Sequence, residues 1–145
     1  MSTTPQRFIG TKTVLASALT RGDYNAYRGW NPPAGEDQSV QGYLVEYTDG
    51  GTPNDPRHGG YISWAPKEQF DNAYRERPLV PGLQPHQQRV VDERAELDEK
   101  LSKLGVFFDS VIFSTLPADE QNRLREQHVV MQSYSAILEE RIDAF

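Results

Sequence analysis

Paired carboxylates are the feature of this sequence that is best suited to hydrolytic chemistry. Glu93 and Glu96 form one Glu-x-x-Glu pair, and Glu140 and Asp143 form a second acidic pair with the same spacing. Carboxylates three residues apart lie on one side of a helix, and carboxylate oxygens are ligands that Mg²⁺ accepts. Two neighbouring helices that brought these pairs together could hold a metal ion for phosphate hydrolysis.

The phase of the apolar residues argues against such a metal site. Leu124, Met131 and Leu138 recur every seven residues and should face a partner helix. Glu140 lies two residues beyond this series and Asp143 five, so both should face water. We therefore expect no metal ligands and no enzymatic activity. The alternative is a metal-dependent all-α nucleotide pyrophosphohydrolase, a class that the two acidic pairs superficially resemble.

The motifs of other catalytic and cofactor sites are missing from the sequence. It has no Gly-x-Ser-x-Gly elbow, phosphate-binding loop, dinucleotide-binding glycine fingerprint or His-Glu-x-x-His sequence, and it has no cysteine. The three histidines are isolated, and Asp49, Asn54 and Asp55 occur in a stretch that is typical of turns rather than of calcium loops. We expect no cofactor.

Arginine and aromatic residues offer a different chemistry, the binding of a nucleotide. "NRLREQ" contains Asn122, Arg123 and Arg125, and Phe107 and Phe113 lie a short distance before it. Arginine pairs with phosphate in a bidentate way and phenylalanine can stack on a base. "PHQQRVV" places His86, Gln87 and Arg89 in the first turn of an expected helix, where free backbone N–H groups favour a phosphate.

Charge and composition narrow the class of partner. The chain has 145 residues and a net charge of -6, so a binder of polymeric nucleic acid or of an anionic membrane is not expected. A mean hydropathy of -0.69 leaves little apolar surface for a core. The absence of cysteine and of a membrane-length apolar run favours a reducing cytoplasm.

The first half of the chain has the pattern of short strands and turns. Expected elements are a strand over Phe8 to Ala16, a brief helix capped by Thr20, a polar loop over Asn31 to Gln41, strands over Gly42 to Gly51 and Tyr61 to Trp64, and a helix that starts at Pro66. Trp64 alternates with Ile62, so we expect it to fill the core rather than to hold a flat ligand.

The second half has a helical period. The spacing predicts a long helix over Pro85 to Asp109, a short connection, and a second long helix that begins at Pro117 and lies antiparallel to the first. Val130, Tyr134 and Ile137 form an additional apolar stripe on the second helix. A two-helix hairpin cannot cover this stripe as well, so we expect a second copy of the hairpin to cover it.

These patterns predict an α+β protein, with a small N-terminal antiparallel sheet and a C-terminal helical hairpin that oligomerises. The expected divisions are a sheet domain over residues 1–77, a linker over 78–84 that contains two prolines and a glycine, and a hairpin domain over 85–145.

Several sequence blocks together resemble a known family. "IGTKTVLASALTRGDYNAYRGW", "GYLVEYTDGG", "GYISWAPKEQFDNAYR", "PHQQRVVDERAELDEKLSKL" and "MQSYSAILEERI" are similar to the bacteriophage Thoeris anti-defence sponge proteins of the first type. The second half alone also resembles the helical hairpin of the phage anti-CBASS sponges of the second type. The resemblance extends from about Ile9 to Ile142.

The resemblance implies a binding protein in the cytoplasm of an infected bacterial host. Such proteins sequester cyclic ADP-ribose isomers, and some also bind cyclic di- or trinucleotides, without cleaving them; they assemble into dimers or hexamers. Carried onto this chain, it implies ligand contacts from Phe107, Phe113, Tyr134, Asn122, Arg123 and Arg125, with Arg28 and Arg57 closing the pocket and His86, Gln87 and Arg89 at a second site. A non-enzymatic phage adaptor protein is the further alternative.

Overall fold

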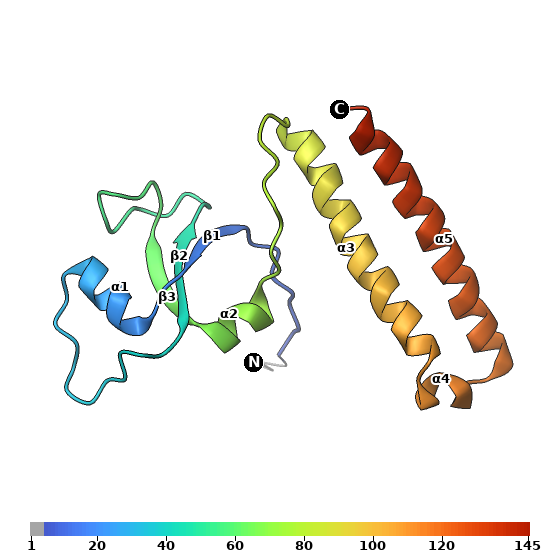
Figure 1. Cartoon of the computed structure of the whole chain (residues 1–145), viewed down its shortest axis with the longest axis horizontal. Coiled ribbons are helices and arrows are strands. Elements are labelled where there is room, and N and C mark those ends of the chain that lie inside the picture. Colours follow the sequence, from blue (N-terminus) through green and yellow to red (C-terminus); the bar gives the residue numbers. More distant parts are fainter. Residues whose placement is uncertain (1–4) are drawn as a thin grey trace. The chain divides into compact units, whose positions relative to one another are not determined.

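The computed structural model describes residues 5–145 and divides the chain into two compact units, one ending at Arg75 and the other spanning Glu76–Phe145 (Figure 1). The first unit contains β1 (Val14–Ala18), α1 (Arg21–Arg28), β2 (Gly42–Tyr47), β3 (Ile62–Pro66) and α2 (Lys67–Ala73). The second contains α3 (Pro85–Phe108), α4 (Val111–Thr115) and α5 (Ala118–Asp143). The predicted α+β class is confirmed.

The three strands form one antiparallel sheet in the order β1-β2-β3. Side chains alternate between its faces, and Leu44 and Ile62 share the face on which Tyr24 of α1 packs. Trp64 packs against the same cluster and its indole Nε1 donates a hydrogen bond to the carbonyl of Leu19 at 2.9 Å. The prediction that Trp64 belongs to the core is confirmed.

The opposite face of the sheet carries α2. The ring centroids of Tyr43 and Phe70 lie 4.3 Å apart. The Phe70 ring in turn stacks on that of Tyr74, with the centroids 4.7 Å apart. Val45 is only 1% exposed, so this face also contributes to the core. Both faces of the small sheet are therefore used, one for each short helix.

The first strand begins later than predicted. We expected a strand over Phe8 to Ala16, but β1 starts at Val14, which is paired with Tyr47 at the end of β2. Beyond Tyr47 the chain turns at Asp49 and Gly50, so residues before Val14 have no strand beside them. A strand forms only where a neighbouring strand can bond to it, even if the alternating sequence pattern extends further.

Two local predictions for proline and for the hairpin connection were also incomplete. Thr20 caps α1 as expected, but Pro66 is the N-cap of α2 and the last residue of β3 rather than the first helical position. The connection between the long helices holds the short helix α4, whose N-cap Ser110 accepts a hydrogen bond from the backbone N–H of Phe113.

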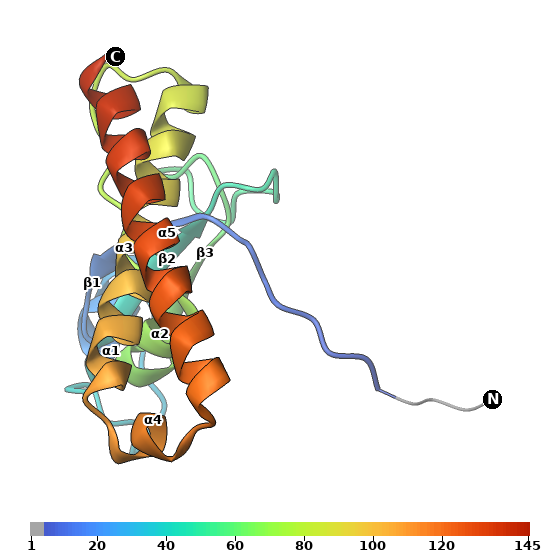
Figure 2. The same cartoon turned by 90° about the vertical axis from the view of Figure 1, so that its right-hand side faces the viewer.

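The long helices α3 and α5 run antiparallel, with α4 at the closed end of the hairpin (Figures 1 and 2). Leu138 is fully buried between them and Val90 is 6% exposed. Two polar contacts also join the helices: the Ser135 hydroxyl donates a hydrogen bond to Asp98 at 2.5 Å, and Arg94 forms an ion pair with Glu139 at 3.1 Å. The predicted antiparallel hairpin is confirmed.

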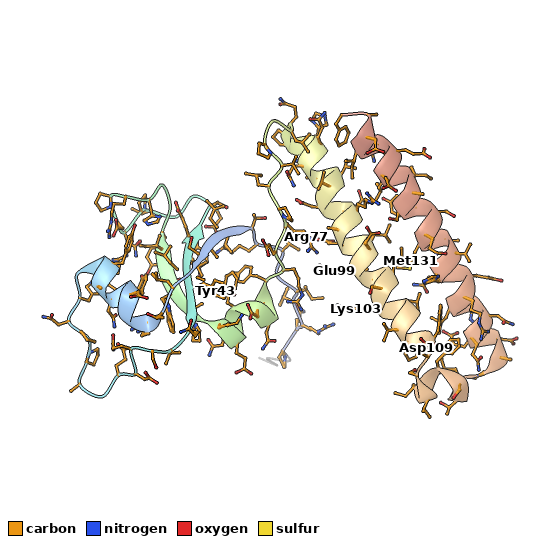
Figure 3. All side chains as sticks on the ribbon, in the orientation of Figure 1. Tyr43, Arg77, Glu99, Lys103, Asp109 and Met131 are labelled. Atoms are coloured by element: carbon orange, nitrogen blue, oxygen red, sulfur yellow. The ribbon has the colours of Figure 1, made fainter. Side chains whose placement is uncertain are left out.

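A further ion pair attaches the segment before α3 to that helix. The guanidinium of Arg77 lies 2.8 Å from a carboxylate oxygen of Glu99, and Figure 3 labels both residues. Gln88 adds to this attachment, because its side chain bonds the backbone of Val80 and Pro78. The residues that precede α3 therefore belong to the helical unit.

Candidate ligand site at the hairpin tip

Three phenylalanines gather at the closed end of the hairpin. The centroid of the Phe113 ring lies 5.7 Å from that of Phe107, in an edge-to-face geometry, and 5.0 Å from that of Phe108, in a tilted geometry. Aromatic rings favour such arrangements. Phe113 is only 4% exposed, because the Ser110 cap directs α4 back across the end of α3. Phe107 is half-buried and retains more accessible ring surface.

Arg125 places a cation on this aromatic cluster. Its guanidinium carbon lies 5.1 Å from the centre of the Phe113 ring, within the range of a cation–π interaction. Within residues 5–145, no carboxylate pairs with Arg125 as a salt bridge. Its side chain is exposed, so its N–H donors remain available to an anion from solvent.

His128 is a tip residue that the sequence analysis did not select. His128 lies on α5, about one helical turn after Arg125. The centroids of its ring and of the Phe108 ring are 5.3 Å apart. The spacing of three residues could have identified it, because such residues share a helix face. The tip therefore presents aromatic surface beside the guanidinium of Arg125 and the imidazole of His128.

The neighbouring candidates differ from Arg125 in their environment. Arg123 forms an ion pair with Glu120 at 2.7 Å and is 66% exposed, and Asn122 is exposed beside it. An anion that bound Arg123 would have to compete with this carboxylate. The structure thus places all three side chains near the start of α5, and of the two arginines only Arg125 lacks a salt-bridge partner among the described residues.

Tyr134 lies on the same helix but away from the tip. Nine residues separate it from Arg125, a distance of about 14 Å along a helix axis. Its hydroxyl donates a hydrogen bond to Glu93 of α3, and this carboxylate raises the Tyr134 pKa. One hairpin does not bring Tyr134 to the phenylalanine cluster.

The expected second-site residues occupy the first turn of α3. His86 and Arg89 are exposed, whereas the Gln87 side chain accepts a hydrogen bond from the backbone N–H of Gln84 at 2.8 Å. Gln87 therefore caps its own helix. Of these three residues, His86 and Arg89 have exposed side chains that do not cap the helix.

The two arginines of the sheet unit are engaged in local contacts. Arg57 lies 3.6 Å from the centre of the Tyr27 ring and binds both carboxylate oxygens of Asp55, which holds the pKa of Asp55 well below its usual range. Arg28 lies 4.8 Å from the Trp30 ring and donates to the carbonyl of Asn54. These contacts fix the loop around Asp55.

Glu140 and Asp143 are exposed to water, as the apolar phase predicted. Glu93 and Glu96 are also exposed, and among the residues that the structure describes no group of three or more His, Asp or Glu side chains could hold a metal ion. No described helix is long and apolar enough to cross a membrane.

The comparisons with known proteins concern the helical unit. The family model described as Sequestin matches residues 84–144. A protein of Enterobacteria phage T4, described as an uncharacterized 7.5 kDa protein in the denB-rIIB intergenic region, is 40% identical over 60 residues, which is 41% of this chain and 94% of that protein. No solved structure matches this chain. Through its helical hairpin, the chain belongs to the same family as this phage protein.

Proposed function

We propose that this protein is a phage anti-defence sponge that binds a cyclic ADP-ribose isomer and withholds it from its effector without cleaving it. The observation that carries the proposal is the tip of the family-matched hairpin, where the Arg125 guanidinium, which has no salt-bridge partner among residues 5–145, lies on the Phe113 ring beside Phe107. The family name is consistent with sequestration. The resemblance to Thoeris anti-defence sponges supplies the ligand class.

The ligand chemistry follows from these groups. Cyclic ADP-ribose isomers carry a pyrophosphate, which a guanidinium binds through charge-assisted hydrogen bonds, and a base, which an aromatic ring can stack on. In this proposal Arg125, with Arg123 and Asn122, holds phosphate or ribose, while Phe107 and Phe113 contact the base. Tight binding alone suffices for sequestration, so no catalytic group is needed.

A second copy of the chain completes the pocket in this proposal. One stripe of α5 exposes the side chains of Val130, Tyr134 and Ile137 by 66%, 42% and 53%. Leaving these apolar side chains in water is unfavourable for a single chain, because the sequence has few apolar residues. Packing two such stripes together would bury them and bring Tyr134 of one chain toward the site of another. We extend the proposal to a homodimer or hexamer.

Further contacts belong to the same proposal. His86, Gln87 and Arg89 would form a second site for cyclic di- or trinucleotides at the start of α3, with Gln87 contributing chiefly as the cap that orders the turn. Arg28 and Arg57 would contribute further ligand contacts, as the resemblance implies. The setting is the cytoplasm of an infected bacterium, as the phage relative suggests.

The test is recovery of intact ligand. The full-length protein is mixed with a Thoeris-type cyclic ADP-ribose isomer and passed through a size-cutoff filter, and the retained fraction is heated and analysed by chromatography. Retention followed by release of the unchanged isomer is expected. Free passage of the isomer would overturn the proposal for this ligand, and a new nucleotide peak would favour the pyrophosphohydrolase alternative.

Arg125→Gln tests the site within that assay. Loss of a charge-assisted hydrogen bond of about 1.5 to 3 kcal/mol should weaken binding by about tenfold or more. Arg141→Gln is the matched control, because it removes the same charge from an exposed position near the other end of α5. Equal affinities for the two variants would remove Arg125 from the site.

A further inference from the structure

The two edges of the sheet differ in whether they are closed. At the β3 edge, the side-chain amide of Asn54 donates to the carbonyl of Ile62 at 2.9 Å and its oxygen accepts from the Ile62 N–H at 2.8 Å. Asn54 therefore bonds this edge as a neighbouring strand would. Unpaired edges can template association with another chain, and Asn54 blocks this edge at Ile62.

The β1 edge has no such closure among residues 5–145. The N–H of Leu19 donates to the carbonyl of Gly42, and the Thr48 hydroxyl donates to the carbonyl of Thr13, so these odd-numbered positions direct their backbone groups toward β2. In an antiparallel pair this direction alternates along the strand. The N–H and C=O groups of Val14, Ala16 and Ala18 therefore point away from the sheet, and no hydrogen bond from the described part of the chain engages them there.

We propose that β1 pairs antiparallel with β1 of a second copy, which joins two three-stranded sheets into one continuous sheet. The outward-facing positions are symmetric about Ala16. A two-fold axis at Ala16 pairs this residue with its counterpart and pairs Val14 of each chain with Ala18 of the other. Each of these pairs would exchange two backbone hydrogen bonds.

The strand also lacks the features that normally prevent such pairing. Val14–Ala18 has the sequence VLASA, without a charge or a proline, so a two-fold arrangement sets no like charges opposite each other. Ala16 is small enough for close approach at the axis. Leu15 is 57% exposed in the single chain, and in the paired register it would lie diagonally across from Leu15 of the second copy.

This interface is distinct from the stripe on α5 that the proposed function uses. It depends only on the sheet unit, and it needs no nucleotide. A chain with both interfaces can associate through the sheet edge and the hairpin independently. The failure of either proposal therefore leaves the other to be judged by its own test.

Single cysteines test the register, because the natural chain has none. Paired Cα atoms at hydrogen-bonded positions are about 5.5 Å apart, within disulfide range. Under mild oxidation, the full-length Ala16→Cys variant should convert largely to a covalent dimer of twice the 16.4 kDa chain mass on a non-reducing gel. Val14→Cys alone and Ala18→Cys alone should remain monomeric on the gel, because each like pair is about 14 Å apart at about 3.4 Å per residue. A mixture of the two should cross-link.

Ile137→Glu is added to each cysteine variant to separate the two interfaces. Cross-linking of Ala16→Cys should persist in this background. The proposal is overturned if Ala16→Cys cross-links no more than Ala18→Cys alone, or if the mixture of Val14→Cys and Ala18→Cys behaves like its components.

Discussion

At the scale of single residues, what a polar side chain can do depends on whether another group already holds it. Arg57 and Arg123 each face a carboxylate, whereas Arg125 rests on a ring and has no salt-bridge partner in the described part of the chain. Residue type alone does not distinguish these three arginines. Their different surroundings make Arg125 the strongest anion-binding candidate of the three.

Glu46 provides a pH-dependent contribution to stability. His58 Nδ1 lies 2.8 Å from its carboxylate and the Gly60 N–H donates to it at 3.0 Å, and these hydrogen bonds lower the Glu46 pKa from its ordinary value of 4.5. A carboxyl whose folded pKa is depressed stabilises the fold above its unfolded pKa and loses that contribution as the pH falls through the folded value.

We therefore expect the unfolding free energy to fall less steeply below pH 4.5 for Glu46→Gln than for the natural chain. Urea unfolding followed by circular dichroism at a series of pH values between 7 and 3 measures this difference. Glu68→Gln, at an exposed position of α2, is the control. Parallel curves for the natural chain and Glu46→Gln would contradict the assignment.

At the scale of elements, α3 and α5 are held together by a narrow apolar seam and by polar pairs. Leu138 is fully buried, whereas its neighbour Ile137 is half exposed. A helix in which adjacent positions differ so sharply has one face fixed by the partner helix and another still open. The hairpin therefore depends on a few buried side chains.

Leu138→Ala should lower the unfolding free energy of the helical unit by about 2 to 5 kcal/mol, because it leaves a cavity that the helix backbones cannot close. Val129→Ala is the control, since Val129 is 59% exposed on the same helix and its truncation should cost within about 0.5 kcal/mol. Urea denaturation monitored by the helical circular dichroism signal compares them. Similar losses for both variants would show that Leu138 is not a core residue of the hairpin.

At the scale of the whole molecule, the exposed stripe of Val130, Tyr134 and Ile137 sets the expected assembly. The chain has a mean hydropathy of -0.69 and therefore few apolar side chains. Burying the exposed ones in an interface between copies would stabilise the protein. Two copies of a hairpin offer each other the same stripe, which satisfies the symmetry of a homodimer.

Ile137→Glu places a charge in that stripe and should shift the protein toward smaller assemblies. Light scattering coupled to size-exclusion chromatography measures the change in mass from the natural oligomer. Gln132→Glu adds the same charge on the opposite side of α5, where neither the seam nor the stripe lies, and should leave the mass unchanged. A natural protein with the mass of one 16.4 kDa chain would refute this interface.

The sequence by itself determined the class of the fold and the hairpin. Pro85 at the start of α3, the seven-residue apolar period and the Thr20 cap are local signals, and local backbone and side-chain preferences suffice to predict the elements that they mark. The start of β1 and the burial of Val45 depended on partners far away in the chain. Only the tertiary structure could decide them, because strand pairing and packing are set by what lies beside a residue.

The same division holds for the candidate site. Sequence patterns selected Phe107, Phe113 and Arg125 by residue type and by the resemblance. They did not select His128, and they treated Arg123 and Arg125 alike. The structure separated these arginines, because whether a guanidinium is paired depends on the three-dimensional position of carboxylates and rings rather than on the order of residues along the chain.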